Sequence, residues 1–209
     1  ATNAIPEQFK DLTDASVDYN KLYPYDPARA AKLLDDAGFP LKNGTRFTAE
    51  LAYIAASPYA AIAKSLAAQW KEVGVDIKLA GLDAQIWTEK VYRKHDFDMS
   101  LISLTGRSDP ILGVDRSFVC NTAQVPFTNP SGYCNAELDG IAAMAGQVPT
   151  EQRRALYKKY EEIVARDLNE ITLMNAPTYN AVSLRFANLA AQFEISFNEH
   201  PNWAEAWVP

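Results

Sequence analysis

A strand–helix–strand pattern over residues 45–83 constrains the fold of this chain more than any other feature. "TRFTAELAYIA" alternates polar and apolar residues and then becomes wholly apolar, as a buried strand does. "PYAAIAKSLAAQWKEVG" has the pattern of an amphipathic helix that Gly74 closes, and "VDIKLAGLD" alternates again. Two strands joined by one helix over about 35 residues indicate a right-handed βαβ unit with a parallel strand pair.

Further elements extend this pattern in both directions. "DPARAAKLLDDAGFP" predicts a short helix that Asp26 caps. "DAQIWTEKVYRKHD" predicts another helix, with Ile86, Trp87 and Val91 on its apolar side, and "FDMSLISL" follows as a strand. "NAELDGIAAMAG" and "TEQRRALYKKYEEIVARDL" predict two later helices, and "EITLMNA" and "YNAVSL" predict two more short strands. We therefore predict an α/β fold with a mixed sheet and flanking helices.

"TGRSDP" follows the apolar strand "FDMSLISL", in the position where open α/β sheets bind ligands, outside the carboxyl end of a strand. Arg107 offers a planar fork to a carboxylate, Asp109 can accept from an ammonium or hydroxyl group, and Gly106 permits close approach to the backbone. The alternative is a local ion pair, in which Arg107 and Asp109 bind each other or bind Asp115 and Arg116.

Two cysteines, Cys120 and Cys134, flank a stretch rich in Pro, Asn, Ser and Gly. The pair cannot supply a four-ligand zinc site, no His lies near it, and it lacks Cys-X-X-Cys spacing. A disulfide would restrain this loop by about 3 kcal/mol in the chain-entropy model and would imply an oxidising compartment. Two inert buried thiols are the alternative.

Composition and motifs argue against several other classes of protein. The chain has 209 residues, 48% of them hydrophobic, and a formal net charge of −6 without a basic run, so we expect no nucleic-acid partner. No apolar stretch approaches the roughly 20 residues that cross a bilayer. No phosphate-binding glycine motif or nucleophile-elbow serine occurs, and neither histidine, His95 or His200, lies near a nucleophile in sequence. We predict no enzyme, no cofactor and no metal site.

A series of segments in fixed order resembles a known family. These segments are "YPYDPARAAKLLDDAGFP", "SLAAQWKEVGVDIKL", "DFDMSL", "TGRSDP", "NPSGYCNAELD" and "EQRRALYKKYEEIVARD". Together they resemble the carboxy-terminal lobe of the family 5 extracellular solute-binding proteins, the dipeptide- and oligopeptide-type receptors of bacterial ABC importers. The resemblance runs from about Tyr23 to about Asn175 and weakens beyond. It implies one lobe of a periplasmic-binding-protein type II fold over residues 1–209, with an irregular lead-in (1–25), an α/β core (26–185) and a tail (186–209).

The resemblance also implies a function. Receptors of this family close two lobes over a solute and deliver it to a membrane permease, so we expect a peptide or similar small polar ligand, a missing amino-terminal lobe and a periplasmic or extracellular location, with a lipid anchor as one form of attachment. The alternative is an enzyme or interaction domain of an unrelated α/β family that uses acidic loop residues.

The resemblance points to particular residues as well. Asp109 matches a loop position that meets the ligand's amino group in the dipeptide-binding relatives, and those relatives carry a disulfide in the segment matching Cys120 to Cys134. Trp87 has two interpretations, core packing or a ring presented to the ligand. The predicted ligand-binding residues are Thr105, Gly106, Arg107, Ser108, Asp109 and Trp87.

Overall fold

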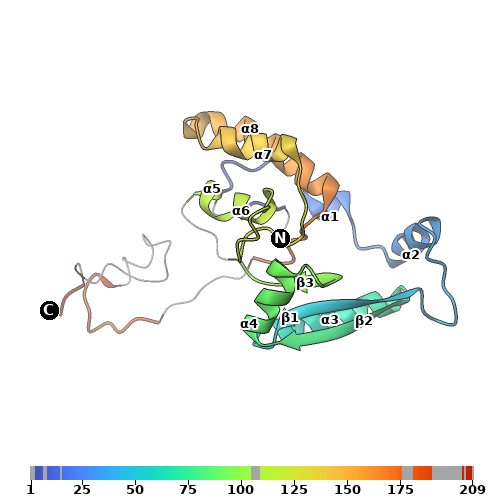
Figure 1. Cartoon of the computed structure of the whole chain (residues 1–209). Coiled ribbons are helices and arrows are strands. Elements are labelled where there is room, and N and C mark those ends of the chain that lie inside the picture. The colour runs from blue at the N-terminus through green and yellow to red at the C-terminus, as the bar shows by residue number, and fades with distance from the viewer. Residues whose placement is uncertain are drawn as a thin grey trace. The chain divides into compact units, whose positions relative to one another are not determined.

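The structure is a computed structural model that describes residues 3–6, 9–14, 16–104, 109–175, 181–189, 204 and 206–208 (Figure 1). The chain divides into two compact units. We name them the sheet unit, Asp18–Leu104 with Cys120–Cys134, and the helical unit, Ala1–Val17 with Thr105–Val119 and Asn135–Pro209.

The sheet unit is built on three parallel strands. They are β1 (Phe47–Ile54), β2 (Val75–Leu82) and β3 (Met99–Leu101), in the order β2-β1-β3. β1 pairs with both neighbours, so that Tyr53 lies beside Gly81 of β2 and beside Leu101 of β3. The predicted βαβ unit over residues 45–83 is confirmed.

Both faces of β1 are covered, which explains why its second half reads as a continuous apolar run. On one face, Leu51 and Tyr53 pack with Ala63 of α3 (Tyr59–Glu72). On the opposite face, Ala52 packs with Trp87 of α4 (Ala84–Thr88). Because side chains alternate along a strand, neighbouring residues of β1 serve two separate hydrophobic clusters.

The remaining helices of the sheet unit are short. α4 continues directly into the π-helical segment η2 (Glu89–Arg93), and α1 (Tyr19–Leu22) and α2 (Pro27–Asp36) precede the sheet. The carboxylate of Asp26 accepts the backbone N–H of Arg29 at 2.9 Å, so the predicted cap of α2 is confirmed.

The helical unit packs two helices against each other, α7 (Ala136–Ala145) and α8 (Thr150–Asp167), which lie side by side in Figure 1. Two single-turn helices, α5 (Pro110–Gly113) and α6 (Asp115–Phe118), belong to the same unit. Asn135 caps α7 by accepting two backbone N–H groups, as the sequence predicts. Tyr157 and Tyr160 of α8 are fully buried.

Several details differ from the sequence prediction. The predicted α/β fold with flanking helices is confirmed. All described strands are parallel, whereas we predicted a mixed sheet, and "EITLMNA" and "YNAVSL" form no strand over residues 170–175 and 181–184. Ile86 is 59% exposed rather than inward, since α4 turns Trp87 and not Ile86 toward β1. Residues 105–108, His200 and most of the tail lie outside the described part of the chain. The division into one lobe with a lead-in, core and tail stays a prediction.

Candidate ligand-binding site

The strand order places a topological switch point between β1 and β3. From β1 the chain passes through α3 to β2 on one side of β1, and from β2 it returns through α4 and η2 to β3 on the other side. The two connections cover opposite faces of the sheet. Open α/β sheets bind ligands outside the carboxyl ends of strands at such a point. A ligand site is therefore expected at the carboxyl edge of β1 and β3.

A hollow of about 480 Å³ lies at this edge, where the chain leaves β1 and enters α3. It is lined by Tyr53, Ala55, Ala56, Ser57, Pro58, Ala60, Ala61 and Lys64. The four alanines leave space because their side chains end at Cβ. Tyr53 is buried, with 7% of its surface exposed, and it forms part of the hollow's wall.

The lining is mostly apolar but includes a positive charge. Lys64 forms no ion pair or hydrogen bond with any residue in the described ranges. α3 begins beside the hollow after Pro58, and no side chain caps its first N–H groups. Both features favour an anionic group in the hollow, since a helix N-terminus and an ammonium group attract negative charge.

The residues that follow β3 also lie at this edge of the sheet. The backbone N–H of Ser103 donates to the hydroxyl of Tyr59, the first residue of α3, at 3.3 Å. Residues 102–104 therefore leave the sheet next to the start of α3, on the way to the predicted ligand loop.

The comparisons with known proteins agree with this architecture. Residues 1–123 match the sequence profile of the bacterial extracellular solute-binding proteins, family 5 Middle. The chain belongs to this family. The resemblance predicted from the ordered segments is thereby confirmed.

Individual relatives show how much of a family 5 protein the chain represents. It is 27% identical over 168 residues to a dipeptide-binding protein of Pseudomonas aeruginosa, covering 77% of this chain and 30% of that protein. It is 28% identical over 169 residues to heme-binding protein A of Haemophilus influenzae, covering 78% and 29%. The chain thus spans about 30% of the length of these relatives.

A solved structure supports the fold. The periplasmic binding protein DppA from Helicobacter pylori, associated with an ABC transporter and solved with the peptide STSA, matches with a TM-score of 0.64 and 20% identity. The match covers 81% of this chain and 32% of that protein. At this identity, the likeness supports the fold class alone.

The predicted loop of this family 5 chain is described only at Asp109, because Thr105, Gly106, Arg107 and Ser108 lie outside the described residues. Asp109 caps α5 by accepting the backbone N–H of Ile111 at 3.0 Å. Its other carboxylate oxygen lies 2.6 Å from Nη1 of Arg153 in α8. Asp109 therefore has a structural role within the helical unit, and its contact with a ligand stays a prediction.

A buried acidic group lies near this ion pair. Asp115 is 4% exposed and accepts the hydroxyl of Tyr157, whose oxygen lies 3.3 and 3.2 Å from its two carboxylate oxygens. Burial raises the pKa of Asp115 to about 6. Burial also raises the pKa of the Tyr157 hydroxyl, which therefore keeps its proton and remains a donor. Together with the Asp109–Arg153 pair, this contact fixes α5 and α6 on α8.

Trp87 is fully buried in the sheet unit. Its ring meets that of Tyr92 edge to face at 5.5 Å, and Val91 and Ala52 complete the cluster. This environment favours the core-packing interpretation, and a contact between Trp87 and a ligand stays a prediction.

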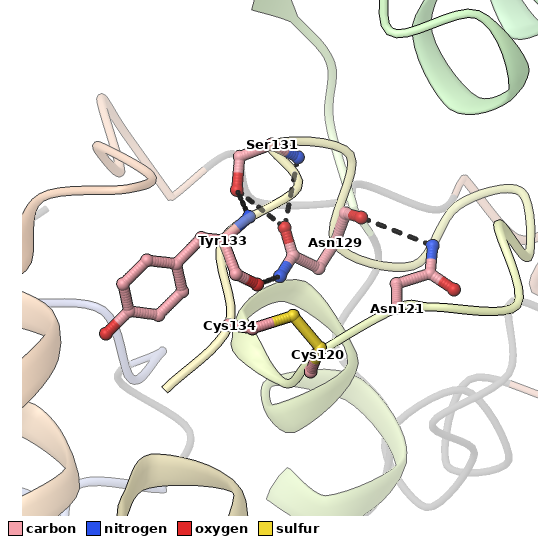
Figure 2. Close-up of a disulfide and its surroundings, with 6 residues drawn as sticks. All are labelled: Cys120, Asn121, Asn129, Ser131, Tyr133 and Cys134. Carbon is pink, nitrogen blue, oxygen red and sulfur yellow. Dashed lines mark hydrogen bonds between the residues drawn. A yellow bond between two sulfur atoms is a disulfide. The ribbon is translucent and has the colours of Figure 1, made fainter. Parts of the chain in front are cut away.

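Cys120 and Cys134 form a disulfide, which confirms the pairing that the sequence favoured (Figure 2). Asn129, which is 1% exposed, organises the loop from inside. Its side chain donates to the carbonyl of Tyr133 at 2.8 Å and accepts from the backbone N–H and hydroxyl of Ser131 at 3.0 and 2.7 Å. The loop is therefore held by polar side chains as well as by the covalent bond.

A second asparagine fixes the outer part of the same loop. Asn121 accepts the N–H of Val125 at 2.9 Å and donates to the carbonyls of Val125, Thr128 and Asn129 at 3.1 to 3.2 Å. The ring of Phe127 then lies 5.6 Å from that of Tyr92. The loop thus covers part of the aromatic cluster around α4 and η2.

Sequence reasoning missed the hollow. The available signal was the run of small residues, "AASP" after a strand and "AAIA" at the start of a helix. Small residues are also common in helix interiors, so the pattern alone does not indicate a cavity. Among the residues that the structure describes, no three metal-ligating side chains gather, and no helix is long and apolar enough to cross a membrane.

Proposed function

We propose that this chain is a solute-binding lobe of a bacterial ABC importer receptor and that it binds a short peptide or a similar small polar solute. The observation that carries the proposal is the hollow at the carboxyl end of β1, beside the switch point of the sheet. Membership of family 5 supports the receptor role, and the name of the Pseudomonas relative supports a peptide ligand.

The lining of the hollow suggests how a ligand would bind. Ala55, Ala56, Ala60 and Ala61 would contact an aliphatic part of the ligand, and Lys64 together with the start of α3 would attract a carboxylate. A peptide offers both, in its side chains and in its carboxyl terminus. Apart from the hollow, Arg107 and Asp109 remain proposed ligand contacts in their own right.

The proposal includes partners and a location. Because the chain spans about 30% of its relatives' length, a second lobe would supply the other half of the ligand contacts, and a membrane permease would receive the solute. The disulfide is consistent with an oxidising compartment, so we place the protein in the periplasm or at the cell surface, with a lipid anchor as one form of attachment. We propose a receptor without catalytic activity.

Calorimetric titration of the full-length protein with a panel of dipeptides and tripeptides tests the function. We expect micromolar or tighter binding of at least one peptide. Ala61→Trp would fill the hollow from an exposed position on α3 and should lower affinity about tenfold or more.

A matched control is available on the same helix. Ala68 is also exposed but does not line the hollow, so Ala68→Trp should bind peptides like the unmodified full-length protein, called the parent below. If no peptide binds the parent, the proposed ligand class is wrong. If Ala61→Trp binds with parental affinity, the ligand does not use the hollow.

A further inference from the structure

Gly81 of β2 and Tyr53 of β1 lie side by side in the parallel register. A Cβ atom built on Gly81 would lie 3.0 Å from the hydroxyl oxygen of Tyr53, 3.1 Å from Cζ and 3.2 Å from Cε2. These distances are shorter than ordinary van der Waals contact. The tyrosine ring therefore lies across the strand position that a side chain at residue 81 would occupy.

The other neighbours of the ring leave it few directions in which to move. Tyr53 belongs to the cluster of buried residues that includes Leu51, Ala63 of α3 and Leu101 of β3. Ala63 is 0% exposed and Leu101 is 9% exposed, so the sides of the ring toward α3 and β3 are closely packed. The hollow, which Tyr53 itself lines, is the open space beside the ring.

We propose that Gly81 determines the size of the ligand hollow, because the absence of a side chain at this position lets the ring of Tyr53 lie over β2 and out of the hollow. This inference rests on the proposed function for its ligand, and it adds a residue pair that selects ligands by size. Gly81 itself does not line the hollow and acts only through Tyr53.

Substitution of Gly81 should not prevent folding. Residue 81 is exposed and near the end of an edge strand, where a β-branched side chain fits the backbone well. A new side chain should therefore displace the Tyr53 ring into the hollow and make the hollow shorter, and it should not unfold the sheet. Ala requires a shift of a few tenths of an ångström, and Val requires more.

The first test needs no ligand. A crystal structure of Gly81→Val should show the Tyr53 ring moved toward Ala60 and Ala61, with the backbone of β1 and β2 unchanged. Gly140→Ala serves as a control in which the Tyr53 ring should keep its position, because a Cβ at Gly140 in α7 would meet no atom within 4 Å. A ring that keeps its position while β2 moves away would overturn the proposal.

The second test measures selection by size, with Ala-Ala and Phe-Phe as probes in calorimetry of the full-length protein. Gly81→Val should weaken Phe-Phe relative to Ala-Ala about tenfold, and Gly81→Ala about threefold. Adding Tyr53→Leu to Gly81→Val removes the displaced ring and should restore the parental preference toward Phe-Phe.

The outcomes separate this inference from the proposed function. If the unmodified full-length protein binds a probe and Gly81→Val leaves the preference between Ala-Ala and Phe-Phe unchanged, the size selection is wrong. The proposed receptor function is then unaffected. A parent that binds neither these nor other peptides overturns the proposed ligand, while the ring position in the variant structure still decides whether Gly81 controls the hollow.

Discussion

The carboxylate of Asp109 lies 2.6 Å from Arg153 Nη1, although the two residues are 44 positions apart in sequence. Arg153 is 15% exposed and Asp109 is 33% exposed, so the pair is partly shielded from water. Asp109 also caps α5. One side chain thus joins the segment after the predicted ligand loop to the longest helix of the helical unit.

We expect Asp109→Ala to destabilise the protein by about 2 kcal/mol, because it removes a helix cap and an ion pair together. Arg153→Met should cost less, about 1 kcal/mol, since it removes the pair and the 3.3 Å hydrogen bond from Arg153 Nε to the carbonyl of Val148 but leaves the helix cap in place. Chemical denaturation measures both. Equal losses for the two variants would contradict a capping role for Asp109.

For ligand binding, Arg107→Ala should lower affinity about thirtyfold with little loss of stability, since a charge-assisted contact in a closed site contributes about 2 kcal/mol. Asp109→Ala should weaken binding and stability together. Calorimetry of the full-length protein with a bound peptide is the measurement. Parental affinity in both variants would show that "TGRSDP" is a turn without ligand contact.

Glu161 should make stability depend on pH. It is 1% exposed, accepts the backbone N–H of Asp14 at 2.7 Å, and has a second oxygen without a hydrogen-bond partner among the described residues. Burial raises its pKa from 4.5 to about 7. The folded chain therefore holds a proton between these pH values that the unfolded chain has released.

It follows that Glu161 contributes most to stability below pH 4.5. Its contribution falls by roughly 3 kcal/mol in total as the pH rises from 4.5 to 7, and it stays low above pH 7. Glu161→Gln keeps the shape without the charge and should remove this part of the pH dependence. Denaturation of parent and variant at pH 4.5, 6 and 8 measures the difference. A difference that does not change with pH would contradict the prediction.

Loss of the disulfide should destabilise the protein by about 3 kcal/mol, the value expected for a loop of this length. Cys120→Ser with Cys134→Ser should behave like the reduced parent, because both leave Asn121 and Asn129 to hold the loop. Mass spectrometry after alkylation checks the bond directly. Two thiols that react in unreduced, folded protein would rule it out.

Lys64 should matter for peptides with a free carboxyl terminus in particular. Lys64→Gln should lower the affinity of such peptides about tenfold and leave the same peptides with an amidated carboxyl terminus nearly unchanged. Lys71→Gln is the matched control, because Lys71 is an exposed lysine two turns further along α3 that does not line the hollow. Added salt should reduce the effect of Lys64. An equal loss for free and amidated peptides would indicate a structural role instead.

Trp87 should behave as a core residue. Trp87→Phe should lower stability by about 1 to 2 kcal/mol, since it leaves space in a fully buried cluster, and should leave peptide affinity unchanged. Thermal unfolding and calorimetry measure the two effects. A large loss of affinity at unchanged stability would favour the ligand-facing interpretation.

The sequence by itself determined the elements whose signals are local. The βαβ unit follows from apolar periodicity, and the helix starts at Asp26 and Asn135 follow from side chains that bond N–H groups two or three residues away. The cysteine pair was readable because both partners flank one short, turn-rich loop. The family was recognisable because its segments occur in a fixed order.

Only the tertiary structure decided how distant residues meet. Parallel pairing puts Tyr53, which lines the hollow, beside Gly81, and the pairs Asp109–Arg153 and Asp14–Glu161 join residues 44 and 147 positions apart. A period in the sequence states which face of an element is apolar. It does not state which element covers that face, nor where packing leaves a space, because both depend on the shapes of side chains brought together by the fold.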